Sequence, residues 1–281
     1  MLLTSRSLLL AACLFALIGV LPINCLAAET VRINGSGSCL DMLKPFVEAY
    51  GKINRAVLIE IEKPLGSSGA LKALLSGALD AVASSKALKP EEIAKGALQR
   101  EYGRTPLAIV TEKNVRKMDI TTKELEEIYA GKTTKWQNGE SIRLILRPSQ
   151  DIDTHILKTL SPGMSNAVNA AHSRPGMIVA VTDPEAYTAV SKTPGGIGAT
   201  GLTSIITEKL PLNVLSLNGV APTPRNLASG TYPLFKEISF VTTPRTTPAA
   251  LKFIDFVYSP QGRAIADKTG VVVSVKSRTD K

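Results

Sequence analysis

Two segments in the first third of the chain each lead from a Gly/Ser-rich turn into an amphipathic helix. The first, VRINGSGSCLDMLKPFVEAY at 31–50, places the turn at 35–38 directly after an apolar strand. The second, LGSSGALKALLSGALDAVASS at 65–85, begins its helix near Ser67 and ends in a strand of small residues. A helix N-terminus presents unpaired N–H groups and positive potential, and glycine lets a ligand approach the backbone. The segments therefore predict an open α/β sheet that binds an oxyanion at the carboxyl ends of its strands.

Two other interpretations of these turns have to be weighed. Ser67 stands where an N-cap residue belongs, so it could simply cap its own helix, and this alternative stays open. A dinucleotide site is not supported, because NGSGSCLD at 34–41 lacks the third glycine of G-x-G-x-x-G. No acidic residue ends a second strand at the position that a ribose would need.

The rest of the chain alternates strands and helices, which is typical of an α/β protein. Residue patterns predict strands at 56–62, 81–85, 107–111, 142–147 and 178–182. They predict helices at 39–51, 69–79, 122–130, 155–160 and 183–192.

The N-terminal segment 1–28 has the features of a cleaved signal peptide. Arg6 precedes an apolar run from 8 to 21, and the small residues Ala27 and Ala28 follow it. Pro22 interrupts the run before it reaches the length of a spanning helix, roughly 18–20 residues. Export of the mature chain is therefore expected.

Cysteine content and charge limit the mature protein further. Cys13 and Cys25 lie in the segment expected to be removed, so Cys39 alone remains and cannot form an intrachain disulfide. Cys13 ends a lipobox-like LAAC, but the apolar run continues past it, which disfavours a lipid anchor. The formal charge of +9 falls to +8 without Arg6. No dense basic run and few aromatic residues accompany this charge, so no nucleic-acid partner is expected.

Six blocks of sequence occur in the order seen in one family of transport proteins. They are NGSGSCLDML, LGSSGALKALLSGALDAVASSKAL, IYAGKTTKW, GGIGATGL, SGTYPL and FIDFVYSPQGRAIADKTG. Through these blocks the chain resembles the periplasmic phosphate-binding proteins of phosphate ABC transporters, over nearly all of its mature length. The resemblance implies a two-lobed type II periplasmic binding protein fold with two crossover strands, which closes on a tetrahedral oxyanion.

The resemblance also implies how the chain is divided between lobes. Lobe 1 would comprise 29–108 and 240–281, and lobe 2 would comprise 109–239. The crossovers would be TPLAIVT at 105–111 and EISFVTTP at 237–244, with a C-terminal helix at 248–258 packing beside the N-terminal sheet. The implied protein is a periplasmic monomer that binds inorganic phosphate or a related oxyanion, needs no cofactor or metal, and delivers its ligand to an ABC transporter permease.

The first lobe supplies four ligand-binding candidates by this resemblance: Ser38, Cys39, Ser67 and Ser85. Cys39 stands where the family has a Thr or Ser hydroxyl. Its thiol could have a lowered pKa at a helix N-terminus, or it could be an inert cysteine packed under the loop. Ser85 stands where the family commonly has an Asp that accepts the proton of monohydrogen phosphate. A serine hydroxyl can donate or accept, so it would also tolerate a fully deprotonated anion.

The second lobe supplies Arg147, Asp153 and Thr154 from RPSQDIDTHIL at 147–157. Arg147 and Thr154 match the family, whereas Asp151 and Asp153 lie near positions that are glycine there. A carboxylate aimed at a bound dianion would weaken binding unless it were turned away or protonated. The alternative is that Asp151 or Asp153 is the N-cap of the following helix.

Enzymatic and metal chemistry find little support in the sequence. GKT at 131–133 ends like a P-loop, but Glu126 replaces its first glycine. The two histidines lack partners at ligand spacing, so no metal site and no catalysis are expected. Two functions remain: binding of an oxyanion for an ABC importer, or a periplasmic sensor or partner-binding module that has kept the fold without transporting phosphate.

Overall fold

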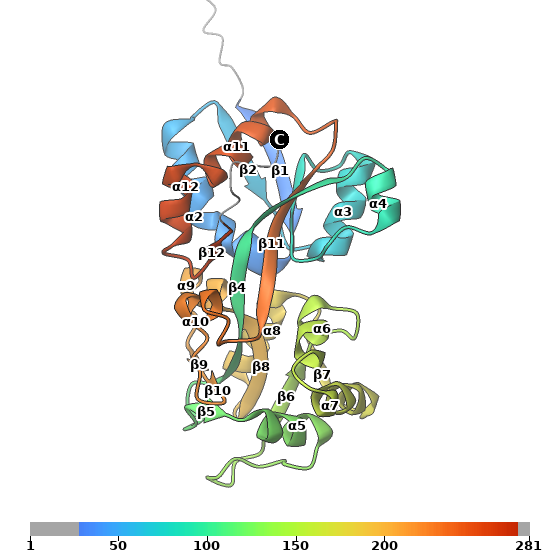
Figure 1. Cartoon of the computed structure of the whole chain (residues 1–281), viewed down its shortest axis with the longest axis vertical. Coiled ribbons are helices and arrows are strands. Elements are labelled where there is room, and N and C mark those ends of the chain that lie inside the picture. Colours follow the sequence, from blue (N-terminus) through green and yellow to red (C-terminus); the bar gives the residue numbers. More distant parts are fainter. Residues whose placement is uncertain (1–27, 275–281) are drawn as a thin grey trace, which may run out of the picture.

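The computed structural model describes residues 28–274 and consists of two α/β lobes connected by two long strands (Figure 1). These strands are β4 (Leu98–Glu112) and β11 (Phe235–Thr242), which run antiparallel to each other from one lobe into the other. The first half of β4 pairs with β11, and its last residues pair with β8 and β9 of the second lobe. The main path of the sheet has the order β2-β1-β3-β11-β4-β8-β6-β7, and β9 and β12 also pair with β4. The chain therefore passes into the second lobe along β4 and returns along β11.

The first lobe contains both ends of the described chain. Its strands are β1 (Glu29–Gly35), β2 (Val57–Ile61), β3 (Ala81–Ser84) and β12 (Val272–Val273). Its helices are α2 (Gly37–Ile53), α3 (Gly66–Ser76), α4 (Pro90–Ala94), α11 (Pro248–Tyr258) and α12 (Pro260–Ala266).

The second lobe lies between the two crossings. Its strands are β5 (Asp119–Ile120), β6 (Arg143–Leu146), β7 (Ile178–Val179), β8 (Gly196–Gly201), β9 (Leu212–Val214) and β10 (Ser216–Leu217). Its helices are α5 (Thr122–Ala130), α6 (Ile152–Lys158), α7 (Pro162–Ser173), α8 (Asp183–Lys192), α9 (Leu202–Thr207) and α10 (Pro224–Ala228).

Each lobe has a hydrophobic core of its own. In the first lobe, α2 buries Leu43 and Phe46 against β1 and against Phe253 of α11. This places the C-terminal helix beside the N-terminal sheet, as predicted. In the second lobe, α5 and α7 cover the sheet formed by β6 and β8, with Leu125 and Ile197 fully buried. Apolar burial of this kind holds each lobe together independently of its partner.

The predicted elements are confirmed in type and differ in length for physical reasons. The helices predicted at 122–130 and 183–192 are observed with those bounds. The helix predicted at 69–79 begins at Gly66 and ends at Ser76, because Gly77 adopts the left-handed conformation at φ +85°. The predicted strand 107–111 is the end of the much longer β4, whose first half is held by β11.

The lobe boundaries expected at 108/109 and 239/240 fall inside β4 and β11 and stay predictions. The predicted signal segment lies almost wholly outside the described residues, which begin at Ala28. Within residues 28–274, no helix is both long enough and apolar enough to cross a membrane.

Candidate anion site between the lobes

A cavity of about 220 Å³ lies where the two lobes meet. Its first-lobe wall is formed by the N-termini of α2 and α3, and its second-lobe wall by the turns at 147–152 and 181–183. Drug-sized ligands occupy roughly 300–1,000 Å³, so this cavity suits a smaller molecule or ion. Both Gly/Ser turns predicted to bind an oxyanion face it.

The N-terminus of α3 is open toward the cavity. Its N-cap residue is Leu65, which offers no side-chain acceptor, so the prediction that Ser67 is the N-cap is wrong. Ser67 lies in the first turn, lines the cavity, and accepts a hydrogen bond from the backbone N–H of Ser85 at 3.1 Å. A hydroxyl donates once and accepts twice, so Ser67 can still donate into the cavity. The first-turn N–H groups of α3 are available to an anion in the same way.

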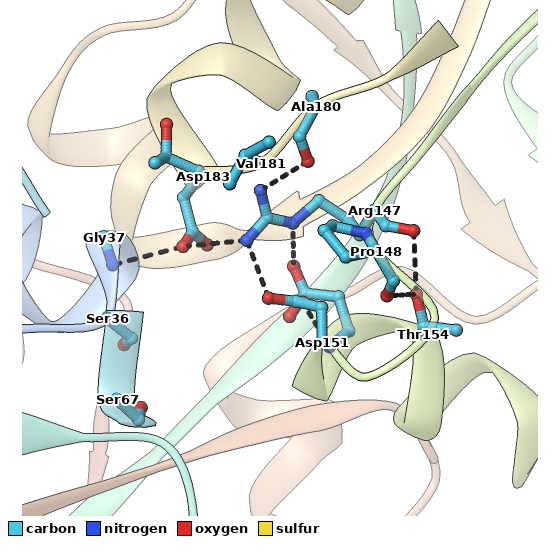
Figure 2. A network of polar contacts seen from close by, with 12 residues as sticks. Ser36, Gly37, Ser67, Arg147, Pro148, Asp151, Thr154, Ala180, Val181 and Asp183 are labelled. Atoms are coloured by element: carbon cyan, nitrogen blue, oxygen red, sulfur yellow. Dashed lines mark hydrogen bonds and ion pairs between the residues drawn. The ribbon is translucent and has the colours of Figure 1, made fainter. Parts of the chain in front are cut away.

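The N-terminus of α2, by contrast, is already occupied. Ser36 caps the helix by accepting from the N–H of Cys39. The N–H of Gly37 donates to Oδ2 of Asp183 at 3.1 Å, and the hydroxyl of Ser38 donates to Oδ1 of the same carboxylate at 2.7 Å. Asp183 belongs to the second lobe, so these bonds cross the cleft, and Figure 2 shows the one from Gly37.

Cys39 and Ser85 lie behind the first turn and do not line the cavity. The Ser85 hydroxyl is 2.9 Å from Oγ of Ser36 and 3.3 Å from Sγ of Cys39. Burial raises the pKa of the fully buried Cys39 thiol, so the alternative of a lowered pKa is wrong. Cys39 fits the other interpretation, an inert cysteine packed beneath the loop, and neither side chain reaches the wall of the cavity.

Arg147, which the sequence predicts to bind the oxyanion, follows the end of β6 and lines the cavity. Its Nη1 donates to the carbonyl of Ala180 at 3.0 Å, and its Nη2 donates to Oδ2 of Asp151 at 2.9 Å and lies 3.6 Å from Oδ2 of Asp183 (Figure 2). Burial would lower the pKa of Arg147, but the carboxylates of Asp183, Asp151 and Asp153 outweigh it and raise the pKa. The guanidinium is therefore held charged by these carboxylates and is oriented by two hydrogen-bond acceptors, the Ala180 carbonyl and Asp151.

Asp151 and Thr154 position the turn that carries Arg147. Asp151 is the N-cap of α6 and accepts from the N–H of Asp153 at 2.9 Å, which confirms the capping alternative for this residue. The Thr154 hydroxyl donates to the carbonyls of Arg147 and Pro148, at 3.3 and 2.9 Å. Thr154 thus shapes the turn from behind and is absent from the cavity wall.

Asp153 faces the interior and is almost completely buried. Its Oδ1 lies 2.8 Å from Nζ of Lys236, and its Oδ2 lies 3.8 Å from Nε of Arg147. Burial, followed by the nearby carboxylates of Asp183 and Asp151, raises the pKa of Asp153 to about 6 against the attraction of Lys236 and Arg147. Asp153 is therefore part of a charge cluster behind the cavity, and it is not its helix's cap.

Sequence reasoning missed two residues of this cluster, Lys236 and Asp183. Lys236 lies in β11 with no exposed surface, and its Nζ is 2.6 Å from Oδ1 of Asp183. Lys236 lies two and four residues before the buried Ile238 and Phe240, and so on the same face of the strand, which was a usable signal for an inward-facing lysine. For Asp183 the signal was weaker: Thr182 caps α8, which leaves the neighbouring carboxylate free for another role.

The charges of this cluster leave it slightly anionic. Burial would raise the pKa of Asp183, but Lys236 and Arg147 outweigh burial and hold that pKa well below its usual range. Asp183 is thus ionised, and the site sets the carboxylates of Asp151, Asp153 and Asp183 against two buried cations. In the described part of the chain, no group of three or more His, Cys, Asp or Glu side chains could hold a metal ion.

Comparison with known proteins assigns the family. The profile of the PBP superfamily domain matches residues 26–261. The chain belongs to this superfamily. Among curated proteins, it is 28% identical over 255 residues to the phosphate-binding protein PstS of Borreliella burgdorferi, covering 86% of this chain and 89% of that one. It is 24% identical over 243 residues to PstS of Bacillus subtilis, covering 83% of this chain and 76% of that one.

A solved structure confirms the fold. A phosphate ABC transporter substrate-binding protein from Clostridium perfringens, solved with bound phosphate, superposes with a TM-score of 0.74 at 23% identity. The match covers 88% of this chain and all of that one. The predicted two-lobed type II periplasmic binding protein fold with two crossover strands is therefore confirmed.

Proposed function

We propose that this superfamily member binds a tetrahedral oxyanion, in the first instance inorganic phosphate, and delivers it to an ABC importer. One observation carries the proposal: four donors from both lobes converge on a single anionic group. The N–H of Gly37, the hydroxyl of Ser38 and the ammonium of Lys236 contact the Asp183 carboxylate directly, and the guanidinium of Arg147 lies close to it. A carboxylate presents two anionic oxygens, so here it stands in for two oxygens of an oxyanion.

The open part of the cavity offers the remaining donors that a tetrahedral ion requires. The first turn of α3 supplies backbone N–H groups and the Ser67 hydroxyl, and Lys86 lies at the rim, where its Nζ donates to the carbonyl of Gln150. Anion binding at a helix N-terminus follows from the unpaired N–H groups and the helix dipole. The relatives in Borreliella burgdorferi and Bacillus subtilis are phosphate-binding proteins, which supports phosphate over other ions of the same shape.

The route of the ligand is part of the same proposal. A two-lobed protein can open and close about its crossover strands, which is how hinge closure around a ligand works in binding proteins. The N-terminal signal features support export, and the related Clostridium perfringens protein is a substrate-binding protein of a phosphate ABC transporter. We therefore propose a periplasmic, monomeric carrier that binds in the cleft and releases its ion to a permease.

Calorimetric titration tests this function. The chain starting at residue 29 is freed of bound phosphate and titrated with phosphate, sulfate, arsenate and molybdate. We expect saturable binding with one ion per chain and the highest affinity for phosphate or arsenate, which share shape and charge. Heat that does not saturate with any of the four ions, from a folded protein, would contradict the proposal and favour the sensor or partner-binding alternative.

A further inference from the structure

The Asp183 carboxylate makes the contacts that an oxyanion would make at the α2 N-terminus. It accepts from the Gly37 N–H and the Ser38 hydroxyl of the first lobe, and it pairs with Lys236 at 2.6 Å. It does not serve its own helix, because Thr182 provides the N-cap of α8. With only 4% of its surface exposed, the carboxylate is as desolvated as a bound ligand.

The backbone opposite is shaped to receive this side chain. A Cβ atom added to Gly37 would lie 2.6 Å from Cβ of Asp183, far inside van der Waals contact. Any residue other than glycine at position 37 would therefore push the second lobe away. Gly37 has no positive φ, so this requirement comes from the approach of Asp183 and not from the turn.

Charge makes Asp183 and a bound oxyanion mutually exclusive in this place. Without Asp183, the carboxylates of Asp151 and Asp153 balance the cations Arg147 and Lys236. With Asp183 the cluster already carries an excess negative charge among side chains that are mostly buried. A second anion beside it would meet strong like-charge repulsion.

We propose that Asp183 is an internal ligand of the oxyanion site, which holds the lobes together at α2 until an oxyanion displaces it. This inference rests on the proposed function. After displacement, the Gly37 N–H, the Ser38 hydroxyl and the cations Arg147 and Lys236 contact the incoming ion, while the Asp183 carboxylate moves into water. The apparent affinity for the ion is then lowered by the fraction of molecules in which Asp183 occupies the site.

The test compares variants in two readouts, ligand-free X-ray scattering and phosphate titration. Asp183→Ala removes the internal ligand, and Asp183→Asn keeps its shape without its charge. Gly37→Ala keeps the carboxylate and blocks its approach. Asp80→Ala is the matched control, since Asp80 is also a buried, arginine-paired carboxylate, but its partner Arg32 lies in the same lobe. Circular dichroism and thermal melting establish that each variant is folded.

We expect ligand-free wild type and Asp80→Ala to be compact, and Asp183→Ala and Gly37→Ala to have a larger radius of gyration. Phosphate should bind Asp183→Ala about tenfold more tightly than wild type, with Asp183→Asn between them. If the scattering of Asp183→Ala and Gly37→Ala is identical to that of wild type, Asp183 does not hold the lobes together, whatever the phosphate titrations show. If Asp183→Ala fails to fold, the scattering of Gly37→Ala alone decides whether Asp183 holds the lobes together.

The two proposals can fail separately. Equal phosphate affinity for wild type and Asp183→Ala would overturn displacement and leave the proposed function standing. No binding of any oxyanion by any variant would overturn the proposed function, and the scattering of the ligand-free forms would then decide by itself whether Asp183 ties the lobes.

Discussion

The N-termini of α2 and α3 begin with the same kind of Gly/Ser turn and face the same cavity, yet they differ in what satisfies their donors. At α2 the Gly37 N–H and the Ser38 hydroxyl are engaged by Asp183 from the opposite lobe. At α3 no side chain caps the helix, and the cavity lies in front of it. The comparison shows that a helix N-terminus predicts anion affinity but not the source of the anion, which can be the protein itself.

The buried charge cluster behind α2 should dominate stability. Replacing Lys236 with methionine leaves the carboxylates of Asp153 and Asp183 without their nearest cation, and breaking a buried pair in this way costs about 3–5 kcal/mol. We expect a large drop in the denaturant midpoint of Lys236→Met. Lys86→Met at the rim of the cavity is the control and should unfold like wild type, whereas equal midpoints for both variants would show that the cluster does not stabilise the fold.

Arg147 makes no hydrogen bond to Asp183 and lies 3.6 Å from it, so its loss is not offset by a weaker Asp183 contact and should weaken ligand binding more than any neutral substitution. A charge-assisted contact contributes roughly 1.5–3 kcal/mol, which corresponds to about 10- to 150-fold in the dissociation constant. Titration of Arg147→Ala with phosphate measures this loss, and thermal melting separates it from unfolding. A dissociation constant within about twofold of wild type would remove Arg147 from the ligand site.

Ser67 and Ser38 give the direct comparison between the two helices. Ser67→Ala removes a neutral donor to the oxyanion and also the acceptor of the Ser85 N–H, so phosphate affinity should fall about 2- to 10-fold, as expected for 0.5–1.5 kcal/mol. Ser38→Ala removes a donor both from Asp183 and from the ion that replaces it, so the two losses should largely cancel. A larger effect for Ser38→Ala than for Ser67→Ala would contradict our assignment of the α2 N-terminus as occupied by Asp183 and the α3 N-terminus as open.

The pKa of Asp153 predicts the smallest effect, a pH dependence of binding. With its pKa at about 6, Asp153 is protonated at pH 5 and ionised at pH 7.5, where it adds negative charge beside Lys236, Arg147, Asp151 and Asp183. Phosphate affinity of wild type should therefore fall more steeply between these values than that of Asp153→Asn. Phosphate itself changes its protonation equally for both proteins. Parallel curves of affinity against pH would therefore show that the charge of Asp153 does not affect phosphate binding.

The same shift has a defined sign for stability. The pKa of Asp153 is raised in the folded state, so the folded protein binds this proton more tightly than the unfolded chain does. The free energy of unfolding should therefore decrease as the pH rises through the window from about 4 to about 6. Asp183 acts oppositely, because its pKa is lowered in the folded state. Ionised Asp183 stabilises the fold at pH values above the usual pKa of an aspartate, and this stabilisation is lost as the pH falls below that value. Denaturant midpoints of wild type and Asp153→Asn across pH 4–7 measure the difference.

Sequence patterns were sufficient for most elements but not for their exact limits. The apolar periodicity of 183–192 and the capping residues of 122–130 are local signals, and both helices were predicted with their observed bounds. The helix α7 was missed, although Ser161 and Pro162 carry the local signature of an N-cap and first turn. The first half of β4 was missed because its pairing with β11 joins segments more than a hundred residues apart.

The site shows the same division between local and distant information. Turn composition and family resemblance mark the positions of Arg147 and Ser67, and both residues line the cavity. Lys236 and Asp183 were missed because their roles arise only when a crossover strand and a helix of the second lobe meet α2. A sequence indicates which backbone donors exist, whereas the acceptor that reaches them depends on how the two lobes pack.

The most direct test of the account is a crystal structure of the protein grown with phosphate. We predict one phosphate between Arg147, the α2 N-terminus and the first turn of α3, with the Gly37 N–H donating to a phosphate oxygen and the Asp183 carboxylate withdrawn. A cleft that holds no phosphate at saturating concentration, with Asp183 still bonded to Gly37 and Ser38, would contradict the claim that this cleft is an oxyanion site.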